Sequence, residues 1–185
     1  MNTLKKDDQL VDEIVDFWFS DVVRPLWFNS TEAFDSELRE RFEATWASAR
    51  DGMYDHWAEE ARSALALVIV LDQFPLNMFR QDARQYSTEA HARDIARQAI
   101  DNGLDQQLEA VQKAFLYLPF MHSEHLADQD RSVELYTAAG LEENLKFAQH
   151  HRDVVARFGR FPHRNAMLGR DSSEEEIEYL KHARW

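Results

Sequence analysis

Residues 31–52 read TEAFDSELRERFEATWASARDG and decide the fold class. In this stretch apolar side chains recur at every fourth position: Phe34, Leu38, Phe42 and Trp46. That spacing places them on one face of an α-helix, which we expect to be buried. Ser30 or Thr31 supplies an N-cap, and Gly52 suits the left-handed residue that follows a helix.

The neighbouring segments show the same period. Leu10, Ile14, Phe17 and Trp18 lie at i, i+4, i+7 and i+8, so a preceding helix has one apolar face. Between the two helices, SDVVRPLWFNS breaks the pattern, and its aromatic residues 27 and 28 are expected to pack inward. The apolar run ALALVIVL (64–71) is too short to span a bilayer. We expect a helix buried on all sides there, with a core strand as the alternative.

Further helices are predicted along the rest of the chain. Their expected ranges are 58–72, ending before Pro75; 86–103, capped by Ser87 and stopped by Gly103; 108–117, broken by Pro119; 123–139; 142–158; and one that opens with SSEEEIEYL, where Ser172 and Glu175 form a capping box. No segment sustains an alternation of apolar and polar residues. We therefore predict an all-α fold in a single domain spanning residues 1–185.

Two corners of this sequence resemble each other. Gly103-Leu104-Asp105 and Gly140-Leu141-Glu142 each separate two expected helices, and a leucine follows at the same offset. Stacked antiparallel helix pairs in a right-handed tetratricopeptide-like array would show such an echo. Two ordinary glycine helix stops would show it equally well.

Composition restricts the classes of function. The 185 residues carry a net charge of −13, which disfavours double-stranded DNA and anionic membranes as partners. The chain has no cysteine, so disulfides, thiolate catalysis and zinc–thiolate sites are excluded. The opening MNTLKKDDQLVDEI is too acidic for a signal peptide, and we expect a cytoplasmic protein.

Three stretches combine aromatic, proline and polar residues in a way that a solvated helix face does not require. They are LDQFPLNMFR (71–80), YLPFMHSEHLADQDR (117–131) and HHRDVVARFGRFPHRNAMLGR (150–170). The third holds five arginines and three histidines against one acid, Asp153. Because proline fixes its own φ, the two Phe-Pro corners hold the residues that follow them at a set angle.

These motifs resemble the bacterial family catalogued as domain of unknown function 924, over nearly the whole chain. The runs that carry the resemblance are LDQFPLNMFR, LPFMHSEHLADQDRSV and HHRDVVARFGRFPHRNAMLGRDSSEEEIEYL. The resemblance implies an all-helical, tetratricopeptide-like fold and no established activity.

We predict from the residues a binding protein whose pocket takes a phosphate- or carboxylate-bearing ligand, because arginine forks suit such groups. The expected ligand-binding residues are Asp72, Gln73, Arg80, His122, Glu124, Asp128, Arg131, Arg157, Arg160, His163, Arg164 and Asn165. A nucleotide, a short single-stranded RNA or an acidic peptide end would fit. Phe74, Phe158 and Phe161 would stack on a base if they were exposed. A helix starting near His163 would add free N–H groups.

Two alternatives stay open. One is a hydrolase that uses His122, Glu124 and Asp128, with or without a divalent metal; its difficulty is that the G-x-S-x-G and G-x-x-x-x-G-K patterns and the zincin motif are all absent. The other is a helical scaffold in which the arginines pair with Asp72, Glu124 and Asp128 for purely structural reasons. For the leading interpretation we expect neither a cofactor nor a metal.

Overall fold

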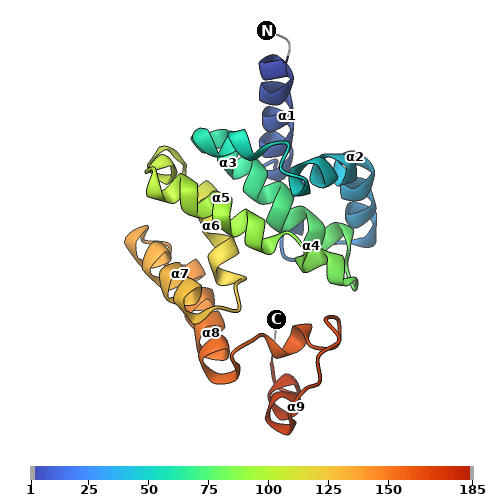
Figure 1. Ribbon diagram of the computed structural model, residues 1–185, viewed down its shortest axis with the longest axis vertical. Helices are drawn as coiled ribbons and strands as arrows, with labels where there is room; N and C mark the ends of the chain where they lie inside the picture. Colours follow the sequence, from blue (N-terminus) through green and yellow to red (C-terminus); the bar gives the residue numbers. More distant parts are fainter. Residues whose placement is uncertain (1–2, 184–185) are drawn as a thin grey trace.

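The computed structural model describes residues 3–183, and within that range it contains helices and turns but no strand (Figure 1). Its α-helices are α1 (Thr3–Trp18), α2 (Glu32–Arg50), α3 (Ala61–Val68), α4 (Phe74–Met78), α5 (Glu89–Asp101), α6 (Ala110–Met121), α7 (Leu126–Ala138), α8 (Glu142–Phe158) and α9 (Glu174–Leu180). The predicted all-α class is confirmed.

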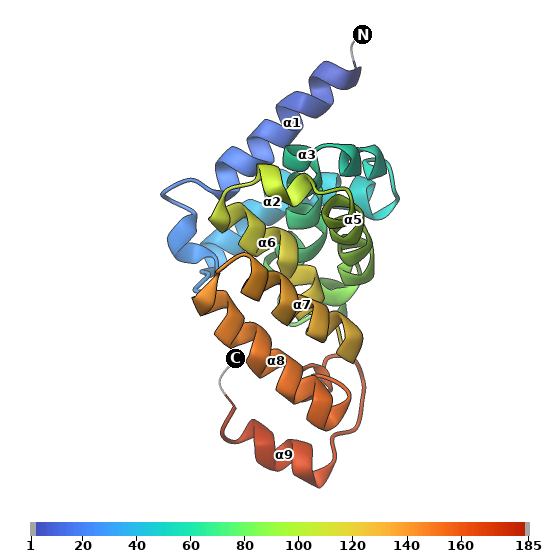
Figure 2. The same cartoon turned by 90° about the vertical axis from the view of Figure 1, so that its left-hand side faces the viewer.

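Neighbouring helices pack against each other along the second half of the chain. α6 contacts α7, and α7 lies beside α8 with the chain running the opposite way (Figure 2). The tetratricopeptide-like array and the single domain stay predictions. α9 lies beyond α8, at the end of the molecule opposite α1 (Figures 1 and 2).

The helix that decided the fold class forms as expected. Thr31 is its N-cap and accepts the Phe34 N–H on Oγ1, while Gly52 follows its last residues with a φ of +81°. The four apolar side chains of the period are all buried. They belong to a main core that α1 to α7 all enter, whereas Val154, Val155 and Phe161 form a second, smaller cluster beneath α9.

The apolar run 64–71 is helical, and every one of its residues has 0% exposure. The expected stop before Pro75 is wrong, because the chain passes from α3 through a π-helical turn, Ile69–Gln73, directly into α4. Proline has no backbone N–H, so Pro75 cannot donate the helical hydrogen bond to the carbonyl four residues before it, which belongs to Leu71. That carbonyl instead accepts the Thr88 hydroxyl at 2.5 Å, so the helix continues at no cost in unsatisfied groups.

Replacing Thr88 by valine is expected to lower the free energy of unfolding by about 1–3 kcal/mol. Thr88 is buried, and its Oγ1 also accepts the Trp46 indole N–H at 3.2 Å, so valine would leave two buried polar groups unpaired. Urea denaturation measures the change. Ser87→Ala is the matched control, since that hydroxyl is exposed and bonds only to the Arg84 carbonyl. Wild-type stability in Thr88→Val would contradict this account of the turn.

Other expected boundaries are corrected. Pro119 lies inside α6 and does not break it, because residues 114–121 are all buried and packing outweighs the local cost. α7 begins at Leu126 and not at Ser123, whose hydroxyl bonds to Asp128. Thr88 and not Ser87 is the N-cap of α5.

The last helix also begins one residue later than expected. The capping box consists of Ser173 and Glu176, because the Ser172 hydroxyl accepts a hydrogen bond from Asn165.

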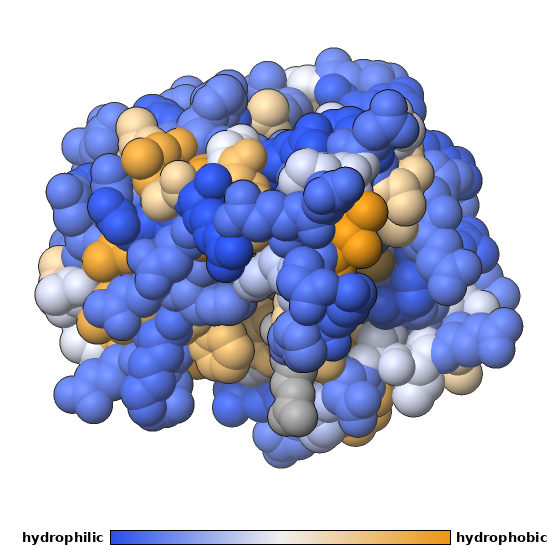
Figure 3. All heavy atoms as spheres, turned by 90° about the horizontal axis from the view of Figure 1, so that it is seen from below, coloured by the Kyte–Doolittle hydropathy of each residue, from blue (hydrophilic) through white to orange (hydrophobic). Residues whose placement is uncertain are grey.

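The surface seen from below is mostly hydrophilic, with small separate apolar patches (Figure 3). Large apolar side chains that stay exposed on the molecule as a whole include Phe28 and Phe147. The expectation that Phe28 packs inward is therefore wrong, although Trp27 beside it is half-buried.

Candidate functional site

The candidate site is built around a carboxylate that the fold buries completely. The π-helical turn places Asp72 at 0% and Gln73 at 4% exposure. Asp72 Oδ1 lies 2.9 Å from His122 Nδ1, and Oδ2 accepts a hydrogen bond from Gln73 Nε2 at 2.6 Å. Because an ionised carboxylate can only accept, Nδ1 carries the proton. π-Helical turns inside α-helices occur frequently at functional sites.

His122 stands at the end of α6 between this carboxylate and two pockets. Burial by itself lowers the pKa of His122, but the charge and hydrogen bond of Asp72 outweigh it, so the pKa lies above its usual value. The side chain remains 16% exposed, and its Nε2 has no hydrogen-bond partner within residues 3–183. A histidine held in this way can donate a proton to a ligand or take one from it.

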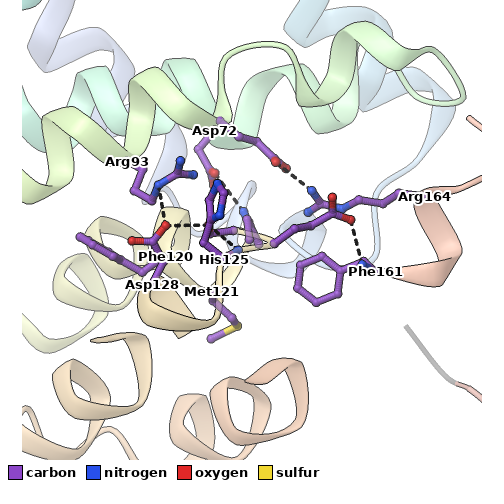
Figure 4. Close-up of polar contacts among 12 residues, drawn as sticks. Asp72, Arg93, Phe120, Met121, His125, Asp128, Phe161 and Arg164 are labelled. Atoms are coloured by element: carbon purple, nitrogen blue, oxygen red, sulfur yellow. Dashed lines mark hydrogen bonds and ion pairs between the residues drawn. The ribbon is translucent and has the colours of Figure 1, made fainter. Parts of the chain in front are cut away.

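Arg164 is the second component, and it is fixed from three sides. Its NH1 donates to Glu89 Oε2 at 2.8 Å, with the two side chains only 7% and 11% exposed. The guanidinium carbon lies 4.4 Å from the centre of the Tyr86 ring and 4.8 Å from that of Phe161. Its Nε is buried and has no hydrogen-bond partner among the residues described. Figure 4 shows Arg164 and Phe161 on one side of Asp72, with Arg93 and Asp128 on the other.

Glu124 holds the loop that carries Arg164. Its carboxylate accepts the Phe161 backbone N–H at 2.8 Å and two hydrogen bonds from Arg170, at 2.7 and 2.9 Å. Burial tends to raise the pKa of Glu124, but these donors lower it below its usual range. The Phe161 N–H is thus occupied, and the helix expected near His163 is only a three-residue 3₁₀ turn, Pro162–Arg164. The Arg164 and Asn165 N–H groups are also occupied, because they donate to the Phe161 and Pro162 carbonyls.

These elements enclose a pocket of about 510 Å³, which we call the basic pocket. It is lined by Leu76, Tyr86, His122, Lys146, Phe147, His150, His151, Phe161, His163 and Arg164. Within the part of the chain that the structure describes, no acidic side chain lines it.

Two histidines of the basic pocket are held neutral. Burial lowers the pKa of His151 to about 4, and burial together with the nearby charge of Arg164 lowers that of His163 to about 3. His151 Nδ1 donates to the Phe147 carbonyl at 2.8 Å. In both cases the largest cause is burial, which disfavours the charged form of the imidazole.

The structure brings together only part of the predicted ligand-binding set. His122, His163 and Arg164 line the basic pocket, Asp72 lies directly behind His122, and Gln73 and Arg80 line the adjoining pocket. Glu124 and Asn165 support the loop, since Asn165 bonds to Ser172 and Arg170.

Four residues of that set lie elsewhere: three arginines that pair with acids, and Asp128, which pairs with arginines. Arg131 forms an ion pair with Glu134, Arg157 with Glu175, and Arg160 with Glu176. Asp128 forms ion pairs with Arg93 and Arg97 and accepts a hydrogen bond from the Ser123 hydroxyl. Of the five arginines in the arginine-rich stretch, Arg164 lines the basic pocket, and the other four form ion pairs outside it. Phe74 and Phe161 have 0% exposure, so the condition under which they would stack on a base is not met.

Of the three acids that the scaffold alternative pairs with arginines, two have arginine partners within residues 3–183 and one does not. Glu124 and Asp128 do bind arginines, but Asp72 binds His122. For the hydrolase alternative, His122, Glu124 and Asp128 each have separate partners, and no group of three His, Asp or Glu side chains among the residues searched could hold a metal ion. Every helix within residues 3–183 is too short or too polar to cross a bilayer.

Sequence reasoning missed Tyr86, Glu89, Lys146 and Phe147 as members of this region. Glu89 has the appearance of an ordinary acid in the first turn of a helix, and its partner lies 75 positions away. No local pattern could reveal that contact. His150 and His151 stood beside the arginine-rich stretch, and the density of histidines there was the available signal.

Comparison with known proteins agrees with the resemblance seen in the sequence. No curated protein matches the chain. The solved structure of a protein of unknown function, ATU0120 from Agrobacterium tumefaciens, is similar with a TM-score of 0.90 and 42% identity, covering 95% of this chain and 99% of that one. The model of a family described as bacterial protein of unknown function (DUF924) matches residues 14–184, and the chain therefore belongs to the DUF924 family.

Proposed function

We propose that the basic pocket binds a small anionic ligand through a phosphate or carboxylate group. The observation that carries this proposal is Arg164, a buried arginine held rigidly at a pocket without acidic lining. Arg164 lines this pocket, although its Nε is itself buried and unpaired. The charge of its guanidinium would attract an oxyanion bound there.

The charges of the other lining residues support the same ligand class. His122 is protonated over a wider pH range than an ordinary histidine, and it faces the pocket that Arg164 lines. The neutral His151 and His163 still carry one N–H each, so they remain potential donors. A bound anion would raise the pKa of both and strengthen its own site.

Size favours a small molecule over the other ligands that carry the same chemistry. A volume of about 510 Å³ lies in the usual range of small-molecule pockets. A single-stranded RNA or an acidic peptide would present phosphate or carboxylate equally well, but the net charge of −13 would repel the rest of a long polyanion. We therefore place the small anion first.

Orthophosphate is the probe for this proposal, measured by isothermal titration calorimetry at low ionic strength. Wild-type protein is expected to bind it, and the double variant Arg164→Gln/Glu89→Gln to bind at least about tenfold more weakly, because a charged hydrogen bond is lost. Removing both charges avoids leaving Glu89 buried alone. Arg157→Gln is the control, since that arginine lies outside the pocket. Equal affinity of the double variant and wild type would overturn the proposal.

An enzyme acting on the same ligand is the second candidate, favoured by the Asp72–His122 pair. A buried carboxylate that fixes the tautomer of a histidine is the arrangement used to orient acid–base catalysts. Release of phosphate from an aryl phosphate by wild-type protein, lost in His122→Asn while orthophosphate binding persists, would favour catalysis over binding alone.

A further inference from the structure

A second pocket adjoins the basic pocket and differs from it in chemistry. It encloses about 180 Å³, and we call it the aromatic pocket. Its lining residues are Trp27, Phe28, Ser30, Gln73, Leu76, Asn77, Arg80 and His122. Leu76 and His122 line both pockets, so the two cavities meet at these side chains.

We infer that the ligand of the basic pocket extends past His122 and places a flat heteroaromatic ring in the aromatic pocket. Its class is then a phosphate ester of an amino-substituted heteroaromatic compound, as in a nucleoside monophosphate. This inference rests on the proposed function, because the basic pocket has to hold the phosphate.

Phe28 provides the surface for the ring. Its side chain is 78% exposed although it belongs to an aromatic cluster, with the Phe115 ring parallel to it at 6.3 Å and an interplanar angle of 3°. Trp27 lies behind it and is fixed, since its indole N–H donates to the Trp18 carbonyl at 2.9 Å. An exposed aromatic face on a fixed support, beside a cavity, is what base stacking requires.

Gln73 supplies the polar recognition. Its Nε2 must face Asp72, because a carboxylate accepts only from the amide NH₂, and this fixes the orientation of the whole amide. The amide oxygen then accepts no hydrogen bond from the described chain, although Gln73 is only 4% exposed. An acceptor held in this way selects a ligand with an N–H donor, such as the exocyclic amine of adenine, cytosine or guanine.

The remaining polar groups of the aromatic pocket carry little net charge. Arg80 donates to Asp35 at 2.8 Å and to Asn77 Oδ1 at 3.1 Å, while Asn77 Nδ2 donates to the Gln73 carbonyl. The charge of Arg80 is thus neutralised by Asp35. An uncharged ring suits this pocket.

His122 lies where the two parts of such a ligand would join. Its Nδ1 is occupied by Asp72, so only Nε2 can contact the ligand. The sugar, which joins the ring to the phosphate ester, would pass over that nitrogen.

The test compares AMP, CMP and GMP with orthophosphate by calorimetry on the full chain. At least one nucleotide is expected to bind about tenfold or more tightly than orthophosphate. Phe28→Ala should remove that advantage and leave orthophosphate affinity unchanged, whereas Val22→Ala, at another exposed apolar side chain, should change neither. If AMP binds, purine riboside monophosphate, which lacks the exocyclic amine, should bind less tightly than AMP.

The outcomes separate this inference from the proposed function. If orthophosphate binds in a manner that depends on Arg164 but no nucleotide binds more tightly, the aromatic pocket is not a subsite and the anion site stands. If the nucleotide advantage survives Phe28→Ala, the ring lies elsewhere and the inference is wrong. If neither orthophosphate nor any nucleotide binds, both proposals fall.

Discussion

Replacing Arg164 by methionine is expected to lower the free energy of unfolding by about 3–5 kcal/mol, the largest effect of any single substitution proposed for this chain. The methionine side chain replaces only the aliphatic part of the arginine, so the contacts of the guanidinium carbon with the Tyr86 and Phe161 rings are lost as well. It removes the partner of Glu89, whose side chain is only 11% exposed.

The cost arises from the carboxylate that remains. Burial raises the pKa of Glu89, and the charge and hydrogen bond of Arg164 act against that rise. Without Arg164, the carboxyl must either stay charged in an apolar environment or take up a proton on folding. Both choices favour the unfolded chain, in which Glu89 is hydrated.

The double variant Arg164→Met/Glu89→Leu should recover most of the loss, because a buried ion pair replaced as a whole by apolar residues is often no less stable than the original. Urea denaturation at pH 7 measures all variants. Arg157→Met is the control: its side chain is 54% exposed and pairs with the exposed Glu175, so a change of about 1 kcal/mol or less is expected. A single variant as stable as wild type, or a double variant no better than the single one, would contradict this view of the pair.

Lowering the pH from 6.5 to 5 is expected to destabilise the protein, by up to about 3 kcal/mol per pH unit if His151 and His163 both contribute fully. Their pKa values in the folded protein, about 4 and about 3, lie below the 6.5 of an unfolded histidine. Unfolding therefore takes up protons in this interval, and acid shifts the equilibrium toward the unfolded chain. The destabilisation should level off only near the folded pKa values.

Other titratable groups change the free energy of unfolding in different pH ranges or in the opposite direction. The raised pKa of His122 leaves it protonated in both states below pH 6.5. The carboxyls of Glu124 and Glu176, whose pKa values are lowered, lose their contribution only as the pH falls below about 4.5. The raised pKa of Glu89 opposes the histidines.

His163→Asn isolates one histidine from this background. Stability curves from urea denaturation at pH 7, 6 and 5 should show a slope smaller than wild type by up to about 1.4 kcal/mol per pH unit. If the two slopes agree, His163 is not held neutral in the folded protein.

Both predictions concern titratable side chains that are buried or nearly buried. A buried pair with unsatisfied atoms and two histidines that cannot protonate are poor choices for a structural core. Natural proteins retain such features mainly where a site requires them, which agrees with an anion pocket at this position.

The sequence predicted the helices because their signals are local. One helical face is indicated by the spacing of Phe34, Leu38, Phe42 and Trp46, and the ends of that helix by Thr31 and Gly52. All these residues lie within a few turns of one another. The errors at Pro75 and Pro119 have a common cause. Proline removes one hydrogen bond locally, but a distant hydroxyl from Thr88 or the burial of a whole segment decides whether the helix survives.

The sequence also indicated Asp72 and His122, because each lies beside a proline corner at the end of an apolar helix, and it indicated Arg164 through the cluster of basic residues. It could not distinguish Arg164 from Arg157 or Arg160. That distinction depends on Glu89, Tyr86 and the two pockets that meet at His122, which come from separate parts of the chain. Helical periodicity is a property of neighbouring residues, so the sequence by itself determined the fold class. Which charges are buried, and with which partner, depends on contacts between distant segments, and only the tertiary structure decided it.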